Sequence, residues 1–239
     1  MASPYFYEEH IPEGHLFSLN EDTSRHVIQV LRMREGEQLT ITNGKGQVLI
    51  AEIVKPDKIA TSVKRISVTD SSTPANKITI ALSLLKNEPR FEWFLEKATE
   101  IGVKEIIPLV CERTEKQHFR YERMNKIMIS AMLQSQQSWL PVLRQPVKFN
   151  DVVQSNGYDK RFIAHCVNEN KLSLNLAPGV ADPGNKIILI GPEGDFTLKE
   201  IELSVSNNFT PVSLGNTRLR SETAGIYAAV ILQSAVDGG

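Results

Sequence analysis

Two short segments in the C-terminal half of the chain combine glycine with charged side chains directly after an apolar run. The first reads Gly191-Pro-Glu-Gly-Asp-Phe-Thr197 and follows Ile187–Ile190. The second reads Ser213-Leu-Gly-Asn-Thr-Arg-Leu-Arg-Ser-Glu-Thr-Ala224 and leads into an apolar helical stretch over residues 225–236. Glycine lets a backbone approach a ligand closely, and loops at the carboxyl ends of parallel strands line a crevice. Both segments are therefore candidate ligand-binding loops.

The charges of the first loop narrow the choice of ligand. Phosphate-binding loops use bare backbone N–H groups, as in GxxxxGK[ST] or GxGxxG, and neither pattern occurs in this sequence. Glu193 and Asp195 instead place two carboxylates in the loop, which would repel a phosphate and suit hydroxyl groups, an amine or a cation. A cationic nucleoside cofactor without phosphate fits these charges, and S-adenosylmethionine is the obvious candidate.

Two further motifs precede these loops along the chain. They read His26-Val-Ile-Gln-Val-Leu-Arg-Met-Arg34 and Lys97-Ala-Thr-Glu-Ile-Gly102. Together with Leu189-Ile-Gly-Pro-Glu-Gly194 and Leu214-Gly-Asn-Thr-Arg-Leu-Arg-Ser-Glu-Thr-Ala224, they form four segments in a specific order. In this order the segments resemble the RsmE-type 16S rRNA (uracil-N3) methyltransferases of the SPOUT superfamily, and the resemblance extends over nearly the whole chain.

The resemblance implies the fold class. This is α/β, with a C-terminal SPOUT-type α/β trefoil-knot methyltransferase domain and a small N-terminal PUA-like β-barrel that binds RNA. Two departures stand out: Asp195 occupies a position where a second glycine is more usual, and Leu133-Gln-Ser-Gln-Gln137 replaces a stretch that more commonly contains Glu-Gln. The second departure falls on a helix that would belong to the partner contact or the substrate pocket.

The resemblance also implies the cofactor and the residues that bind it. The cofactor would be S-adenosyl-L-methionine, and the two glycine loops would be parts of its knotted site. The residues that match the family's cofactor-binding motifs are Leu189, Ile190, Gly191, Glu193, Gly194, Leu214, Gly215, Leu219, Arg220, Ser221, Thr223 and Ala224.

Methyl transfer to a uracil nitrogen makes two demands on the site. A methyl group on a sulfonium is already activated, so the enzyme must hold donor and acceptor in line and help N3 lose its proton. Negative charge then spreads onto the carbonyl oxygens of the base, and a guanidinium stabilises it in a dry pocket. Arg220 is the first candidate for this role and Arg218 the second. Glu222 or Glu193 is a candidate proton acceptor, although each can equally bond the helix N-terminus or the cofactor.

Basic residues in three segments are candidates for RNA contact, because arginine and lysine bind phosphates and neighbouring aromatic rings stack on unpaired bases. A first group lies on or beside a predicted N-terminal helix, and a second follows the first strand of the C-terminal part. A third belongs to a segment where Lys116 and other basic residues alternate with aromatic ones. The candidates are Arg25, His26, Arg32, Arg34, Lys86, Arg90, Arg113 and Arg120. The alternatives are a solvated helix face for the first group and an exposed loop before an ordinary helix for the third.

Composition limits the class of protein. The formal net charge of −1 over 239 residues argues against a protein that coats nucleic acid through its overall charge, so RNA binding must come from local patches. Cys111 and Cys166 are too isolated for a disulfide framework or a zinc site, and the histidines show no metal-ligand spacing, so no metal is expected. Without a signal-like N-terminus or an apolar run of transmembrane length, the chain is expected to be cytoplasmic.

Residues 1–70 have the pattern of a small β-barrel. β-forming residues occupy 17–19, 38–42 and 47–54, and Asn43–Gly46 is a strong hairpin turn between the last two. One helix interrupts the strands, and Asp22 or Thr23 is expected to cap it. Its apolar face would consist of Val27, Val30 and Leu31.

A polar, proline-containing stretch over 71–76 is expected to link this barrel to a second domain over 77–239. There a strand over 78–85, an amphipathic helix around 91–101 and a strand over 105–110 form a βαβ unit. The pattern recurs at the glycine loops, where a strand over 211–214 precedes a helix that opens at Ser221 with its hydroxyl as the cap.

The resemblance also implies a substrate RNA and a partner subunit. By resemblance, the substrate is one exposed uridine of 16S rRNA in the small ribosomal subunit, and the protein is a homodimer with its active site at the subunit interface. The C-terminal helix would supply part of that contact, unless these residues pack within their own subunit: Ile226, Ala229, Val230, Leu232 and Gln233. Two rival functions stay open, namely a non-catalytic RNA-binding assembly factor and an RNA methyltransferase that acts on a ribose 2′-hydroxyl.

Overall fold

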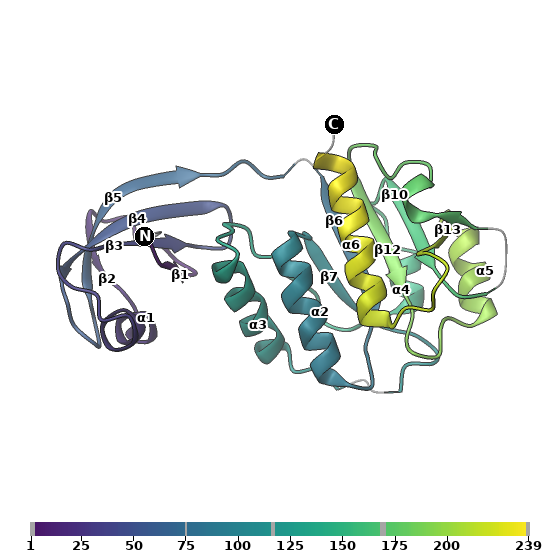
Figure 1. Cartoon of the computed structure of the whole chain (residues 1–239), viewed down its shortest axis with the longest axis horizontal. Helices are drawn as coiled ribbons and strands as arrows, with labels where there is room; N and C mark the ends of the chain where they lie inside the picture. The colour runs from purple at the N-terminus through teal and green to yellow at the C-terminus, as the bar shows by residue number, and fades with distance from the viewer. Residues whose placement is uncertain (1–2, 75, 116–117, 168–170, 238–239) are drawn as a thin grey trace. The chain divides into compact units, whose positions relative to one another are not determined.

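The computed structural model describes residues 3–74, 76–115, 118–167 and 171–237, and Ala75 of the expected linker lies outside them (Figure 1). The fold divides into two compact units. The first consists of Met1–Thr73 and Met132–Leu140, and the second of Pro74–Ala131 and Pro141–Gly239. The N-terminal unit thus includes one segment from much later in the chain.

In the described residues the first unit forms a five-stranded sheet in the order β1-β3-β4-β5-β2. Its strands are β1 (Tyr5–Tyr7), β2 (Leu16–Ser18), β3 (Gln38–Thr42), β4 (Gln47–Lys55) and β5 (Ser62–Asp70). The strands expected over 17–19, 38–42 and 47–54 are confirmed to within one residue. Asn43 makes the predicted turn, because its Oδ1 atom accepts hydrogen bonds from the N–H groups of Lys45 at 2.8 Å and Gln47 at 3.1 Å.

The N-terminal helix begins with a different cap from the predicted one. α1 (Glu21–Arg25) is preceded by Asn20, whose side-chain oxygen accepts a hydrogen bond from the N–H of Thr23 at 2.8 Å. The prediction that Asp22 or Thr23 caps the helix was therefore wrong. Asparagine is among the best capping residues, and Asn20 starts the helix before either alternative is reached.

A π-helical turn over His26–Val30 follows α1 directly. In it the N–H of Leu31 donates to the carbonyl of His26, five residues earlier. This wider spacing moves later residues off the face that a 3.6-residue period would give them. The predicted apolar face is consequently wrong: Val27 is buried, whereas Val30 and Leu31 are exposed.

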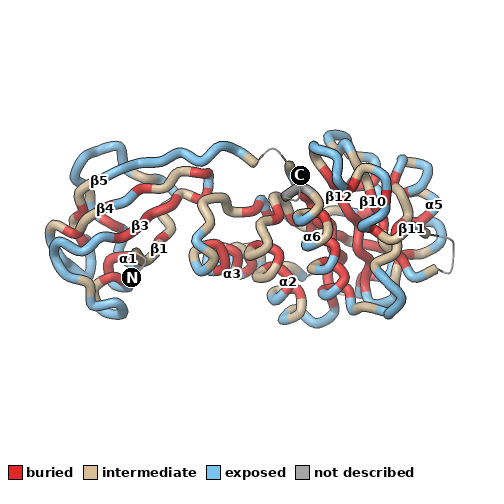
Figure 2. The backbone as a smooth tube through the Cα atoms, turned by 45° about the horizontal axis from the view of Figure 1, so that its top comes forward, coloured by how far each residue is buried: buried red, intermediate tan, exposed pale blue. Residues whose placement is uncertain are grey.

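The described part of the second unit contains an eight-stranded sheet along the path β11-β13-β10-β12-β6-β7-β8, with β9 paired to β7. Its strands are β6 (Lys77–Ser83), β7 (Glu105–Val110), β8 (Val142–Leu143), β9 (Val147–Lys148), β10 (Lys160–Ala164), β11 (Leu172–Ser173), β12 (Asn185–Ile190) and β13 (Thr210–Ser213). All of these pairs are parallel. Parallel strands covered on both faces are largely continuous apolar runs, which is why the sequence located β6 and β7 to within two residues. β13, in which only Val212 is buried, was located to within one residue. Every residue of β12 except Asn185 is buried (Figure 2), whereas β10 is buried at Phe162 and Ile163.

The helices that follow β6 along the chain are α2 (Glu88–Ile101), α3 (Tyr121–Gln134), α4 (Phe149–Val153), α5 (Leu198–Ser206) and α6 (Ser221–Asp237), with a short 3-10 turn over Leu174–Leu176. α2 ends at Gly102, whose left-handed φ of 92° closes the helix. As expected for an amphipathic helix, Phe91, Phe94, Leu95 and Ala98 are buried along one face, and Ile101 is half-buried. α2 and α6 lie side by side (Figure 1). None of the helices in the described ranges combines the length and apolarity of a membrane span.

α6 exposes only one of the five residues expected to contact a partner. Ala229 and Leu232 are fully buried, so packing within the second unit accounts for them. Ile226 and Gln233 are half-buried, and only Val230 of the expected residues is exposed. The exposed side of α6 is formed by residues spaced as on one helix face: Thr223, Tyr227, Val230 and Ser234.

Candidate functional site

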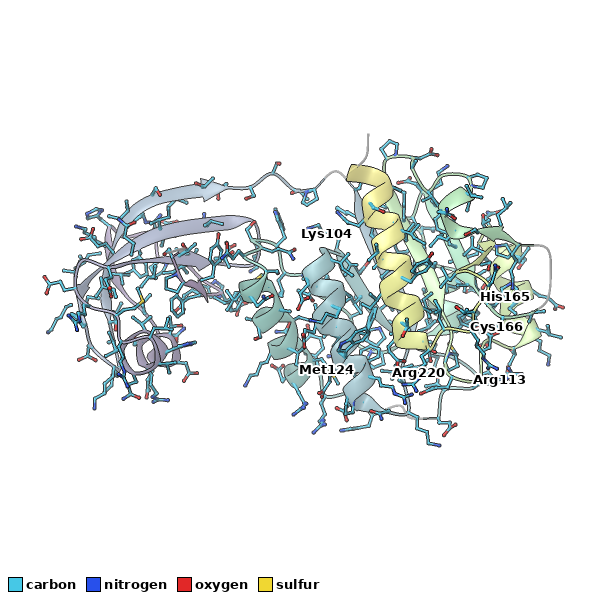
Figure 3. The ribbon with its side chains drawn as sticks, viewed as in Figure 1. Lys104, Arg113, Met124, His165, Cys166 and Arg220 are labelled. Atoms are coloured by element: carbon cyan, nitrogen blue, oxygen red, sulfur yellow. The ribbon has the colours of Figure 1, made fainter. Side chains whose placement is uncertain are left out.

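A cavity of about 840 Å³ opens at the carboxyl ends of β10, β12 and β13. These strands are neighbours in the order β13-β10-β12, so the loops that follow them meet at one edge of the sheet. The first residues of α6 close a further side. Figure 3 labels Arg220 at the start of α6, and His165 and Cys166 after β10. The two glycine loops that the sequence singled out therefore face one cavity, and the loop after β10 forms a third wall.

Most residues predicted to bind the cofactor line this cavity: Ile190, Gly191, Glu193, Leu214, Gly215, Leu219, Arg220, Ser221 and Ala224. The candidate catalytic residues Arg218 and Glu222 line it as well. Leu189 is fully buried in the core, and Gly194 and Thr223 lie off the cavity wall. Within the described ranges, no cluster of His, Cys, Asp and Glu side chains suits a metal ion. The individual roles of these residues stay predictions.

The loop after β12 is tightly wound and held at both ends. A Cβ atom at Gly191 would lie 3.2 Å from the backbone nitrogen of Phe196 and 3.3 Å from its ring, so a side chain there would require Phe196 to shift slightly. Phe196 is buried against Phe149, with ring centroids 5.4 Å apart. Thr197 then caps α5 in a capping box, in which the Glu200 carboxylate accepts from the N–H of Thr197 at 2.8 Å.

Both carboxylates of this loop bond the chain itself. The Oε1 atom of Glu193 accepts a hydrogen bond from the backbone N–H of Lys86 at 3.1 Å. Asp195 accepts from the N–H of Cys166 at 2.7 Å and from the N–H of Phe196 at 2.8 Å. The backbone of Asp195 has a φ of 62°, a left-handed conformation that accounts for the glycine more usual at this position. The acidic residues thus brace the loop that carries them.

The loop after β13 turns at Gly215. Its φ of 118° lies in the region that favours glycine, and no described atom lies within 4 Å of a Cβ built there. The Ser213 Oγ atom closes the turn, because it accepts from the N–H of Gly215 at 3.3 Å and donates to the carbonyl of the same residue at 3.1 Å. The open space leaves the backbone of Gly215 accessible from the cavity.

α6 begins at Ser221, but this residue is not the helix cap. The carbonyl of Arg220 accepts a first helical hydrogen bond, from the N–H of Ala224 at 2.8 Å, so Arg220 occupies the cap position. The prediction of a serine cap was wrong by one residue, because helical bonding starts before the hydroxyl-bearing residue. Ser221 and Glu222 are buried, whereas the arginine side chains of the loop are exposed.

A charge pair joins the start of α6 to α2. The Nε atom of Arg90 lies 3.7 Å from the Oε1 atom of Glu222, whose side chain is 9% exposed. A carboxylate that is so far removed from water needs a charged or hydrogen-bonding partner. Arg90 was expected to contact RNA, and the structure places it on the cavity wall beside the candidate proton acceptor.

The sequence did not identify the loop after β10 as part of the site. This loop contributes Ala164, His165, Cys166, Val167 and Lys171 to the cavity wall. The Lys171 ammonium donates to the carbonyl oxygens of His165 and Val167, each at 2.6 Å, and lies 3.2 Å from the Nδ1 atom of His165. A signal was available in the sequence, because the apolar run over 162–164 ends in the polar pair His165-Cys166. This is the pattern of a buried strand that ends at a crevice.

The candidate RNA-binding residues of the first unit surround the π-helical turn and are exposed: Arg25, His26, Arg32 and Arg34. Arg25 forms an ion pair with Glu21, and the ring of His26 packs edge-on against Phe6 with centroids 5.7 Å apart. The same turn exposes Val30. The first unit therefore presents cationic and apolar groups together.

The candidates of the second unit are all engaged with the chain itself. The ion pairs are Lys86–Glu115 at 2.8 Å, Arg90–Glu222 at 3.7 Å and Arg120–Glu88 at 2.7 Å. Arg113 donates to the carbonyl oxygen of Gly194 at 2.6 Å, which ties it to the loop after β12. Lys116 lies outside the described residues. To contact an RNA phosphate, each of these side chains would have to break its present ion pair or hydrogen bond.

Both parts of the chain match known families. Residues 71–233 match the RNA methyltransferase domain, and residues 19–64 match the RNA methyltransferase PUA domain. The "Ribosomal RNA small subunit methyltransferase E" of Synechocystis sp. is 30% identical over 211 residues, which cover 85% of this chain and 68% of the relative.

Solved structures share the fold over nearly the whole chain. A "probable rRNA-methyltransferase" from Porphyromonas gingivalis is 33% identical, with a TM-score of 0.89 over 98% of this chain and 99% of that chain. A ribosomal RNA small subunit methyltransferase E from Neisseria gonorrhoeae, bound to S-adenosyl methionine, is 27% identical, with a TM-score of 0.86 over 98% of both chains. The expected α/β fold with a small PUA-like domain is confirmed, and the trefoil knot stays a prediction.

Proposed function

Because the chain belongs to the RNA methyltransferase family, with ribosomal RNA small subunit methyltransferases E among its relatives, we propose that it methylates N3 of a uridine in 16S rRNA. S-adenosylmethionine would supply a methyl group that its sulfonium has already activated. The observation that carries the proposal is the cavity at the carboxyl ends of β10, β12 and β13, with its two glycine loops and the exposed residues Arg218 and Arg220 on its wall.

The cavity has the size and chemistry that a nucleoside cofactor requires. A volume of about 840 Å³ is within the range of small-molecule sites. Gly191 and Gly215 present backbone without side chains, and the open space at Gly215 is one that a Cβ would begin to fill. Ile190 and Ala224 add buried apolar surface to the wall. We assign cofactor binding to the backbone of the two glycine loops and to these apolar side chains.

For methyl transfer, the charged residues of the cavity must accept the N3 proton of the base and stabilise the negative charge that its loss leaves. Loss of the N3 proton leaves negative charge on the uracil oxygens, which a guanidinium stabilises. Arg220 is our first assignment, because it lies on the cavity wall at the start of α6, and Arg218 is the second. Both side chains are exposed, so bound RNA must exclude water from them. Glu222, held beside Arg90, is our candidate proton acceptor, and Glu193, already bonded to a backbone N–H, is the alternative.

We assign the initial capture of rRNA to the exposed basic side chains around the π-helical turn. Their positive charge can bind phosphates without base specificity, which suits a unit that positions the substrate. We also propose that the protein acts in the cytoplasm, because its proposed substrate is rRNA of the small ribosomal subunit. A variant with Arg32→Ala and Arg34→Ala should bind small-subunit RNA more weakly and with a smaller salt dependence, whereas the same change at Lys55 and Lys58 should not.

We propose that the protein acts as a homodimer whose contact includes the exposed side of α6. Tyr227 and Val230 are each 46% exposed on that side, and Trp93 on α2 is 43% exposed. Large apolar side chains exposed on one helix face, as Tyr227 and Val230 are, are typical of protein interfaces. Molar mass in solution tests this, because Val230→Glu should convert a dimer into monomers.

The test of the proposed function uses labelled S-adenosylmethionine and small ribosomal subunits that lack the modification. Mass spectrometry of rRNA fragments then locates the transferred methyl group. A methyl group on uracil N3 is the expected result. A methyl group on a ribose 2′-hydroxyl would contradict the proposed acceptor and keep the enzyme class, and absence of cofactor binding would favour a non-catalytic RNA-binding protein.

A further inference from the structure

Asp195 connects two loops of the cavity through one carboxylate. Its Oδ2 atom accepts a hydrogen bond from the backbone N–H of Cys166 at 2.7 Å, and its Oδ1 atom accepts from the N–H of Phe196 at 2.8 Å. Cys166 follows β10 and Asp195 follows β12, neighbouring parallel strands whose last paired residues are Ala164 and Ile190. The carboxylate therefore joins the segments that follow β10 and β12 by a hydrogen bond beyond the last paired residues of the two strands.

Lys171 holds the same segment through different backbone groups. Its ammonium donates to the carbonyl oxygens of His165 and Val167, the residues on either side of Cys166. Lys171 thus binds carbonyl groups of the β10 loop, whereas Asp195 binds an N–H of that loop. Both side chains line the cavity and direct charged atoms at the backbone of the chain.

We propose that Asp195 is a positioning residue for S-adenosylmethionine. Its carboxylate holds the β10 loop against the loop after β12 and so sets the shape of the cavity, without itself being a ligand. The inference rests on the proposed function. Each of the two oxygens of Asp195 already accepts an N–H group of the chain, and this bonding supports a positioning role.

Backbone conformation and carboxylate chemistry make opposite predictions for position 195. A φ of 62° favours glycine over aspartate, so conformation alone would make Asp195→Gly neutral or stabilising. If the carboxylate positions the loop, the same substitution removes two charge-assisted hydrogen bonds. Asp195→Asn keeps the size of the side chain and tolerates the left-handed conformation, but it offers one oxygen in place of two.

The matched control is Asn208→Gly. Asn208 has a φ of 64°, almost that of Asp195, and it is exposed between α5 and β13, off the cavity wall. The Asn208→Gly variant shows how a change to glycine at a left-handed position affects the measured properties when no cavity loop depends on the side chain. Any effect shared by the two sites belongs to the backbone, and any effect confined to position 195 belongs to the carboxylate.

The experiment measures two properties of the wild-type protein and these variants. The first is the rate at which Cys166 reacts with a thiol reagent in the absence of cofactor. Cys166 is exposed, whereas Cys111 is buried and burial raises the pKa of its thiol to about 12, so peptide mass spectrometry can follow Cys166 separately. The second is the Kd for S-adenosylmethionine by calorimetry, together with KM and kcat for methyl transfer.

We expect Asp195→Gly and Asp195→Asn to raise Kd and KM for S-adenosylmethionine about tenfold and to leave kcat within about twofold. Cys166 should react about threefold faster or more in both variants, because its loop opens more often. Asn208→Gly should match the wild type. Tight cofactor binding by Asp195→Gly, or an unchanged Cys166 rate, would overturn the inference. Wild-type protein that binds no cofactor would overturn the proposed function, while the Cys166 rates would still decide whether Asp195 holds the loop.

Discussion

A Cβ atom at position 225 would lie 2.7 Å from the Cε2 atom of Phe94, so α6 can lie against α2 as closely as it does only because Gly225 has no side chain. Phe94 is fully buried on α2, and α6 also packs on β6 and β12. The contact lies within one turn of Glu222. The packing of the two helices therefore helps to fix the end of α6 that faces the cavity.

Gly225→Ala should destabilise the protein, although alanine is the better helix former. Helix propensity favours alanine by about 1 kcal/mol, whereas overpacking a close contact costs about 1–3 kcal/mol. We expect a net decrease in the free energy of unfolding, measured by urea denaturation. Thr223→Ala, on the exposed side of the same helix, should leave that free energy unchanged or slightly raised. Wild-type stability in Gly225→Ala would mean that Phe94 moves aside at no cost.

Lys186→Met should raise the free energy of unfolding near neutral pH. The Lys186 side chain is fully buried, and the described residues provide no hydrogen-bond partner for its Nζ atom. An unsatisfied buried polar group costs about 1–3 kcal/mol, which an apolar side chain of similar length avoids. Lys64→Met is the control, because Lys64 forms an ion pair with Glu52 at 2.7 Å on the other sheet and should gain nothing from the change.

The same lysine makes the effect depend on pH. Burial lowers the pKa of Lys186 below its ordinary value of 10.5, and the charge of Asp182 opposes the shift. Between the lowered pKa and 10.5 the unfolded chain binds more protons at this position, so wild-type stability rises with pH there. The advantage of Lys186→Met should therefore be largest below the lowered pKa and shrink in alkaline solution. An advantage that stays constant as the pH rises would contradict this account.

Arg220→Ala should lower kcat far more than it lowers cofactor affinity. Removing one group that stabilises a developing negative charge typically costs about 100-fold or more in kcat. We expect the Kd for S-adenosylmethionine to stay within about threefold of the wild-type value. Arg218→Ala, one exposed arginine earlier in the same loop, should have a smaller effect on kcat. Equal losses in kcat and cofactor affinity would instead make Arg220 a binding residue.

Gly215→Val should weaken cofactor binding by about tenfold or more, because the new side chain would occupy cavity space beside an exposed backbone. The strain of a side chain at a φ of 118° needs its own control. Gly157→Val supplies it, since Gly157 has a φ of 104°, similarly open space and a position off the cavity wall. Calorimetry on both folded variants separates the two effects. Wild-type affinity in Gly215→Val would remove Gly215 from the proposed cofactor site.

The elements around the site could be predicted because their signals are local. An apolar run that ends in glycine marks the carboxyl end of β12, and such a run is required by a parallel strand that is buried on both faces. β13 is followed by Gly215, although only Val212 of the strand is buried. The N-terminal helix shows where local patterns fail. Asn20 caps that helix in place of the predicted Asp22 or Thr23. A π-helical turn over His26–Val30 then rotates the later apolar residues away from the core.

The sequence by itself thus determined the family resemblance, the two glycine loops and the strands that precede them, because each depends on residues adjacent in the chain. Only the tertiary structure decided that the loop after β10 is a third wall and that Asp195 bonds Cys166, 29 residues away. Strand order decides such neighbours, and β10 lies between β12 and β13 although it precedes both in the chain. A side chain's partner is the group that folding brings within hydrogen-bonding distance, and no local periodicity records that group.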